Sequence, residues 1–249
     1  MVPNLAPENF KNQTKLMAAL SRYMKPYLDD PTHRERAGKS MLQSLTRHLE
    51  GEREVLPDIQ FNTAQQLENE VVRCYIALAS MQHSFGQCEY YFRRYPFNGL
   101  PVNHGDHLRN ICEMYFDRIE QFRDRLKHLV NALKSHAEDD DSRYGEIIRN
   151  YKKFFKWECA QRNRTHHHNR FAYDAIDQLG LIDLLQIGER LRPTEMGKML
   201  PQGSSIYRQE ARKWANRVKE QTKALNTVVE FAAGLVLEKC SFLNAEEPA

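Results

Sequence analysis

Long apolar runs are missing from this 249-residue sequence. No stretch approaches the roughly 18 uninterrupted apolar residues that a membrane-spanning helix requires. The first residues, Met-Val-Pro-Asn, also lack the basic-then-apolar pattern of a secretory signal. We therefore expect a cytoplasmic protein with no membrane partner.

Cysteine, glycine and proline are scarce, at 5, 11 and 10 residues. Apolar residues make up 41% and charged residues 28%, a composition that excludes a disordered chain and a fibrous repeat. The cysteines are odd in number and form no CxxC pair, which argues against a disulfide framework. We expect buried thiols at Cys74, Cys88, Cys112, Cys159 and Cys240.

A strong excess of one charge is also missing. The formal net charge is +3, which excludes a histone-like, tail-driven mode of binding to nucleic acid. The sequence has no glycine-rich phosphate loop, no GxSxG and no Cys–His signature, so nucleotide hydrolysis and acyl transfer find no support. The zinc pattern HExxH is absent as well. We expect no cofactor and no metal.

Helical periodicity is present along almost the whole chain. Apolar residues recur in steps of three and four over 67–88, 108–133 and 214–235, with Gln221 as the one polar substitution. This spacing predicts three long helices, each with one apolar stripe. Alternation of the strand type is nowhere sustained, so the predicted fold class is all-α without a significant sheet.

A fourth helical region is expected over roughly 143–185, with Asp140, Asp141 or Ser142 as its N-terminal cap. Short connections between these helices predict an up-and-down bundle of four to five long helices. Breaks between them are expected at 95–101, 138–142 and 188–204.

The N-terminal segment 1–60 is expected to form a helical extension to this bundle. Two shorter helices are predicted there, over 8–27 and 32–50, followed by a loop with Pro57. The sequence leaves open whether they pack on the bundle or form a separate arm. The predicted organisation is an extension over 1–60 and a bundle over 61–249.

The most informative feature is the polar run 162–168, Arg-Asn-Arg-Thr-His-His-His, in the fourth helical region. A permanent cation, an amide and titratable imidazoles within two helical turns are suited to holding a phosphate and moving a proton. The segment 143–170 has eight basic residues against Glu146 and Glu158, a net charge of +6. Its basic residues are Arg143, Arg149, Lys152, Lys153, Lys156, Arg162, Arg164 and Arg170.

The run from Arg162 to His167 consists of an arginine, a polar residue, three variable residues and a histidine. On a helix of a helical bundle, this pattern resembles the HEPN superfamily, named for its occurrence in higher eukaryotes and prokaryotes. The resemblance covers the motif and the stretch 67–237 and does not extend to residues 1–60. Many members of that family are metal-independent endoribonucleases, often toxin or antiphage-defence components, and others are non-catalytic binding or dimerisation modules.

The resemblance implies a composite site, in which two protomers of a homodimer line one cleft with both motifs. Arg162 would bind the scissile phosphate, His167 would transfer protons and Asn163 would orient one of them. Attack by the 2′-OH of RNA requires a base, an acid and a cation, which two such motifs supply together. An antitoxin or defence-complex partner is also implied. The residues expected to contact RNA are Lys152, Lys153, Lys156, Arg164 and Arg170.

Helical spacing and the family pattern favour different histidines. On a continuous helix, Arg162 and His166 lie nearly on one face, whereas His167 is about 140° away from Arg162. The resemblance favours His167. A distorted turn or a contribution from a second protomer would reconcile the two, so His166 and His168 are reserve candidates for catalysis.

Plainer interpretations exist for the same residues. Basic residues on a helix most often form a solvated face, and three histidines are also a possible metal site. Consecutive helical positions point in different directions and no acid lies near the histidines before Asp174, which disfavours zinc. The competing functions are a non-catalytic module that binds RNA or a protein, and a helical scaffold that uses the apolar stripe of its last helix.

Two further clusters have a chemical and a structural interpretation. Aromatic residues beside Arg93 and Arg94 would stack on bases or, as we prefer, pack between helices. His104 and His107 lie beside Asp106 at an expected helix start, where capping is favoured over catalysis. The aromatic residues are Tyr90, Tyr91, Phe92, Tyr95 and Phe97.

Overall fold

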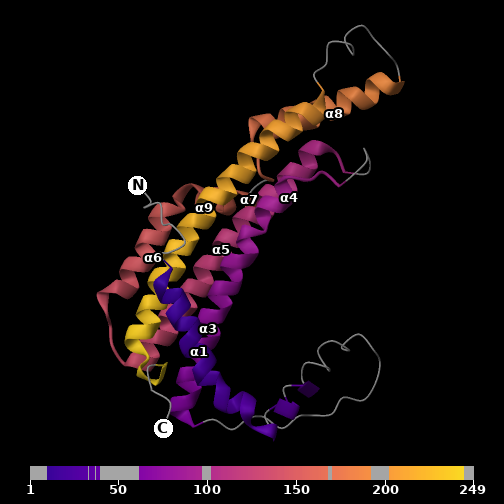
Figure 1. Ribbon diagram of the computed structural model, residues 1–249. Helices are drawn as coiled ribbons and strands as arrows, with labels where there is room; N and C mark the ends of the chain where they lie inside the picture. The colour runs from indigo at the N-terminus through magenta and orange to yellow at the C-terminus, as the bar shows by residue number, and fades with distance from the viewer. Residues whose placement is uncertain are drawn as a thin grey trace.

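The computed structural model describes residues 10–32, 34–36, 38–39, 62–96, 102–167, 170–191 and 202–243. These ranges contain helices and no strand, which confirms the all-α prediction (Figure 1). The helices are α1 (Lys11–Asp29), α3 (Thr63–Gly86), α4 (Cys88–Phe92), α5 (His104–Ala137), α6 (Ser142–Phe154), α7 (Lys156–His167), α8 (Asp174–Leu191), α9 (Gly203–Lys239) and the 3₁₀ helix η3 (Ser241–Leu243).

Three long helices, α3, α5 and α9, form the body of the molecule (Figure 1). They have 24, 34 and 37 residues and contain the three predicted apolar stripes, except that Cys88 begins α4. α3 packs along α5, and α9 contacts both. A capping box starts α3, in which Asn62 accepts a hydrogen bond from the Gln65 amide and the Gln65 side chain accepts one from Asn62.

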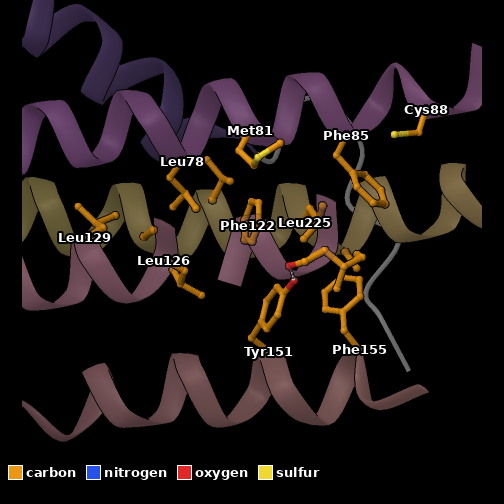
Figure 2. Packing of buried hydrophobic residues seen from close by; sticks show 14 of the residues in the cluster. Leu78, Met81, Phe85, Cys88, Phe122, Leu126, Leu129, Tyr151, Phe155 and Leu225 are labelled. Atoms are coloured by element: carbon orange, nitrogen blue, oxygen red, sulfur yellow. Dashed lines mark hydrogen bonds between the residues drawn. The ribbon is translucent and has the colours of Figure 1, made fainter. Parts of the chain in front are cut away.

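The core lies between these three helices and continues to the neighbouring helices, and Figure 2 shows the part that reaches α6. The rings of Phe122 and Tyr151 stack with centroids 5.6 Å apart. The buried Tyr151 hydroxyl donates a 2.6 Å hydrogen bond to the Ile119 carbonyl, so its polar atom is satisfied inside the apolar core. Fully buried neighbours include Leu78, Phe85, Leu126, Phe155 and Leu225.

The fourth helical region consists of three helices, α6, α7 and α8, and not of one. The first break is at Phe155, whose side chain is fully buried against Tyr151 at a centroid distance of 4.7 Å. No glycine or proline marks this break, so the sequence pattern does not reveal it. Asp141 caps α6 as predicted, with Oδ1 accepting a 2.9 Å hydrogen bond from the Arg143 amide. The polar motif, however, lies on α7.

The first N-terminal helix packs on the bundle. α1 runs along α9 and buries Leu16, Ala19 and Leu20 in the common core. Glu230 of α9 accepts hydrogen bonds from the amides of Asn12 (2.7 Å) and Gln13 (3.0 Å), which are unpaired donors in the first turn of α1. The second predicted helix, 32–50, lies mostly outside the described residues.

The cysteines have the environment expected of structural thiols. Four are buried and Cys159 is half-buried. Burial raises the pKa of Cys74 and of Cys88 to about 11, and that of Cys240 to about 12. These three thiols are therefore neutral near pH 7 and poor nucleophiles.

Candidate nucleic-acid interface

Exposed positive charge gathers around the corner between α6 and α7. Lys152 and Lys153 lie in the last turn of α6, where the helix dipole favours cations, and Lys156 begins α7. These lysines are exposed, as are Arg149 and Arg164. Within the described ranges, no carboxylate lies at ion-pair distance from any of the five. We call these five residues the α6–α7 basic surface.

α7 has one exposed stripe and one face that packs on the bundle. Lys156, Ala160, Asn163 and Arg164 are exposed and follow one another at helical spacing. The opposite face carries Glu158, which is 1% exposed. Asn163 and Arg164 therefore continue the basic surface along the helix.

Arg162 lies between these two faces. Its side chain is 22% exposed and leans toward α5, where Nε is 3.9 Å from Oδ1 of Asp117. Nε is buried and has no hydrogen-bond partner in the described part of the molecule. An ion pair at this distance without a hydrogen bond is weak. Among the described residues, Asp117 is therefore the carboxylate that an anion bound to Arg162 would displace.

The three histidine candidates are placed by the backbone only in part. Positions 166 and 167 are in the last turn of α7, their side chains lie outside the described residues, and His168 lies outside altogether. α7 is a continuous α-helix up to residue 167. No distorted turn within it brings Arg162 and position 167 to one face, so they remain about 140° apart around the axis.

A buried carboxylate on α7 anchors the motif helix to the bundle. Oε1 of Glu158 accepts hydrogen bonds from the Tyr115 hydroxyl (3.0 Å), Arg217 Nη2 (2.7 Å) and Gln221 Nε2 (3.3 Å). The Arg217 guanidinium also lies 4.1 Å from the ring centroid of Trp157. A buried charge needs such partners, and here they come from α5 and α9.

Sequence reasoning counted Glu158 only as one acid in the basic segment. Its spacing held a signal, because Ile147, Tyr151, Phe155 and Glu158 are four, four and three residues apart and share the buried stripe. The segment 143–170 has two acidic residues, Glu146 and Glu158. Because Glu158 is turned inward, Glu146 on α6 is the one acidic residue of this segment that is exposed. Burial of Glu158 thus leaves the outer side of the corner more positive than the sequence count suggests.

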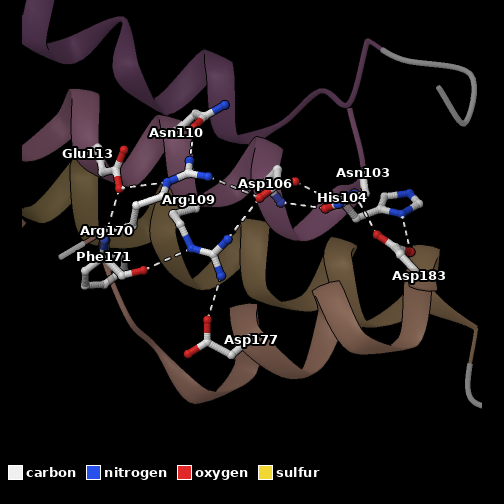
Figure 3. Close-up of polar contacts among 10 residues, drawn as sticks. All are labelled: Asn103, His104, Asp106, Arg109, Asn110, Glu113, Arg170, Phe171, Asp177 and Asp183. Atoms are coloured by element: carbon white, nitrogen blue, oxygen red, sulfur yellow. Dashed lines mark hydrogen bonds and ion pairs between the residues drawn. The ribbon is translucent and has the colours of Figure 1, made fainter. Parts of the chain in front are cut away.

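Arg170, predicted to contact RNA, is occupied by polar groups of α5. Its Nη2 donates a 2.5 Å hydrogen bond to Asn110 Oδ1, and its guanidinium lies 3.5 Å from Asp106 and 3.7 Å from Glu113 (Figure 3). Arg109 is held similarly, by Asp106 (3.0 Å) and Asp177 (2.6 Å). These arginines connect α5 with α8 and the segment before it.

The start of α5 is capped by Asn103, and two residues of the predicted cluster, His104 and Asp106, take part in its contacts. Asn103 caps the helix by accepting a 2.7 Å hydrogen bond from the Asp106 amide. Asp183 of α8 accepts the His104 amide at 2.7 Å and pairs with the His104 ring at 3.0 Å (Figure 3). Together with Arg109 and Arg170, these contacts form what we call the α5–α8 joint.

The described ranges contain neither a cluster of metal-ligating side chains nor a helix that could span a membrane. No group of three or more described His, Cys, Asp or Glu side chains is arranged to hold a metal ion, and the side chains of residues 166–168 lie outside the described ones. None of the described helices is long and apolar enough to cross a membrane.

Comparison with known proteins gives no match to a family model, to a curated protein or to a solved structure. The HEPN resemblance therefore rests on the motif and its helical setting.

Proposed function

We propose that the protein binds RNA through the α6–α7 basic surface. The observation that supports this is five exposed cations on two adjoining helices with no carboxylate partner in the described residues. Cations of this kind gain most from phosphate, because binding releases counterions from the RNA. Paired arginines such as Arg109 gain less, since they must first leave their carboxylates.

We further propose that the bound RNA is cleaved without a metal at the motif, as in HEPN ribonucleases. Arg162 binds the scissile phosphate and His167 transfers protons. Asn163 orients the side chain of Arg162 or of His167. The regular helix supports a site shared between two copies, because Arg162 and position 167 face different directions within one copy. A homodimer then provides both groups at one phosphate. A toxin or defence role, with its antitoxin or defence partner, belongs to the same proposal.

The binding half is tested with a triple variant of the surface, Lys152→Gln, Lys153→Gln and Lys156→Gln. Its affinity for labelled single-stranded RNA, measured by fluorescence anisotropy, should be at least tenfold lower than that of the wild type. The matched control is Lys11→Gln, Lys15→Gln and Arg22→Gln, which removes three exposed cations from α1. Equal affinity of the two triple variants would contradict the proposed interface.

The cleavage half is tested with His167→Ala, His166→Ala and Arg162→Ala on single-stranded RNA and tRNA in excess EDTA. We expect loss of cleavage with retained binding for His167→Ala. Loss only in His166→Ala would correct the residue and keep the activity. Binding without cleavage by the wild type would favour the non-catalytic module.

Mixing two inactive variants tests the shared site. In a heterodimer of Arg162→Ala and His167→Ala, the shared cleft keeps one Arg162 and one His167, which come from different copies. Random mixing should then restore part of the wild-type rate, up to about half, since about half of the dimers are mixed and each has one cleft with both groups. No recovery in a mixture that has exchanged subunits would place the whole site within one copy.

A further inference from the structure

A second surface, formed by the short helix α4 and the part of α9 that it contacts, combines exposed aromatic rings with arginines. Tyr90 and Tyr91 of α4 are 57% and 51% exposed. Phe92 is fully buried, and the half-buried Tyr95 stacks 4.2 Å from the His104 ring. The preferred packing interpretation of this aromatic cluster therefore holds for Phe92 and Tyr95, whereas the other two described rings face outward and Phe97 lies outside the described residues.

Arginines surround these two rings. The Arg94 guanidinium lies 5.0 Å from the centroid of the Tyr90 ring. Arg93 is 54% exposed and pairs with Glu89, which Lys219 of α9 also approaches at 3.4 Å. Positive charge is added by two exposed arginines on the part of α9 that faces α4, Arg208 and Arg212.

Two hollows connect the rings with the arginines. One, of about 760 Å³, is lined by Gln82, His83, Tyr90, Tyr91, Arg93 and the carboxylate of Glu89, which pairs with Arg93. The other, of about 420 Å³, is lined by Arg93, Arg208, Arg212 and Asn216. Arg93 borders both, so a ligand that follows the surface meets aromatic faces first and then the arginines of α9.

We propose that this α4–α9 face binds single-stranded RNA, with bases stacked on Tyr90 and Tyr91 and phosphates on Arg208 and Arg212. Exposed aromatic rings beside a positive groove are how proteins bind single strands with little sequence preference, because every base has a stacking face. A duplex does not fit this chemistry, since its bases are already stacked on one another. The inference rests on the proposed function in naming RNA as the ligand, and it adds the substrate class: a single strand long enough to reach a second surface.

The test removes the rings and keeps the charge. In the double variant Tyr90→Leu and Tyr91→Leu, affinity for single-stranded RNA should fall at least about fivefold, the smallest loss expected for one stacked base. Tyr90→Phe with Tyr91→Phe should bind like the wild type, because the stacking face is kept. Both positions are exposed, and circular dichroism checks that the helices are intact.

An oligonucleotide without bases separates stacking from phosphate contacts. The double leucine variant should bind this abasic strand, and duplex RNA, as the wild type does. The double variant Arg208→Gln and Arg212→Gln should bind both the abasic and the normal strand more weakly than the wild type does. The stacking proposal is wrong if the leucine variant also has lower affinity for the abasic strand, or if its affinity for the normal strand is unchanged.

Photo-crosslinking gives an independent measurement on the unmodified protein. RNA carrying 4-thiouridine should form adducts on the α4 peptide at Tyr90 or Tyr91, and crosslinks confined to α6–α7 would overturn the inference while supporting the proposed function. The converse result, weak binding by the leucine variant and normal binding by the Lys152/Lys153/Lys156 triple variant, would support this face and refute the proposed interface.

Discussion

The described lysines and arginines of this molecule fall into two groups, those paired with carboxylates and those left unpaired. The two groups differ in what they contribute to folding and to ligand binding. At the α5–α8 joint and beneath α7, arginines such as Arg109, Arg170 and Arg217 bridge helices through carboxylates. On the α6–α7 basic surface, Lys152 and Lys156 face solvent. A paired cation has its field largely cancelled and holds the fold together, whereas an unpaired one contributes little to folding and keeps its charge for a ligand. Net charge alone does not distinguish the two roles.

The largest effect is expected at Arg217, the paired cation beneath the motif. Arg217→Met leaves Glu158 buried without its cation, which should lower the free energy of unfolding by about 2–3 kcal/mol, toward the low end for a buried pair because Arg217 is 38% exposed. Urea unfolding measures this loss. Adding Glu158→Gln should recover part of it, since the buried charge is then gone. If the single variant unfolds within about 0.5 kcal/mol of the wild type, the pair is not structural.

The close contact of α5 and α8 gives the next largest effect. A Cβ at Gly105 would lie 2.8 Å from the Gly180 nitrogen and 2.9 Å from its Cα, so Gly105→Ala should push the helices apart and cost about 2 kcal/mol. The matched control is Gly180→Ala, where a Cβ meets nothing within 4 Å. It should be neutral or gain up to about 1 kcal/mol from helix propensity. Thermal unfolding of both variants decides between a tight and a loose joint.

A smaller, pH-dependent effect is expected at the junction of α6 and α9. Arg143 lies 2.6 Å from Asp141 and 2.5 Å from Glu238, and it holds the pKa of both carboxyls below their usual range. The folded state therefore binds fewer protons than the unfolded state, so this contribution is present above about pH 4 and is lost as the pH falls below it.

The variant Arg143→Met should show a shallower loss of stability between pH 5 and 2 than the wild type. Chemical unfolding at a series of pH values measures the two curves. Because Asp139 and Lys239 remain in place at 2.5 Å, the difference isolates Arg143. Parallel curves for variant and wild type would mean that Arg143 does not depress these carboxyl pKa values.

The smallest effect on stability is expected on the unpaired side. The triple variant Lys152→Gln, Lys153→Gln and Lys156→Gln should unfold within about 0.5 kcal/mol of the wild type, because these side chains are exposed and bridge no helices. Urea unfolding beside the α1 triple variant provides the comparison. A loss of about 2 kcal/mol or more would mean that these lysines belong with the structural cations.

The periodic part of the fold was predictable from the sequence. Apolar steps of three and four gave the long helices α3, α5 and α9, since burial of one stripe is decided locally along each helix. The break at Phe155 was not predictable, because it comes from the burial of one ring against Tyr151 and not from a glycine or proline. The packing of α1 on α9 depends on Glu230, which lies near the opposite end of the chain from its partner Asn12.

Charge partners were the least predictable part of the site. The segment 143–170 was recognisable as basic from the sequence. The sequence did not reveal that Arg170 is held by Asn110 and Glu113 on α5. Glu158 was counted only as one acid of the basic segment, although it is buried in contact with Tyr115 and Arg217. Such pairs join residues on helices that are distant in the sequence, and no local pattern reports them. The roles of Arg162, Asn163 and His167 remain proposals from the motif.

The most direct test of the central claim is the salt dependence of RNA binding. In a plot of the logarithm of the binding constant against the logarithm of the salt concentration, the triple variant Lys152/Lys153/Lys156 should have a slope about 2 units less steep than the wild type. Each phosphate contact with a single strand contributes about 0.7 to this slope. The α1 triple variant should keep the wild-type slope. Equal slopes for all three proteins would contradict the claim that the unpaired cations of α6 and α7 contact the phosphates.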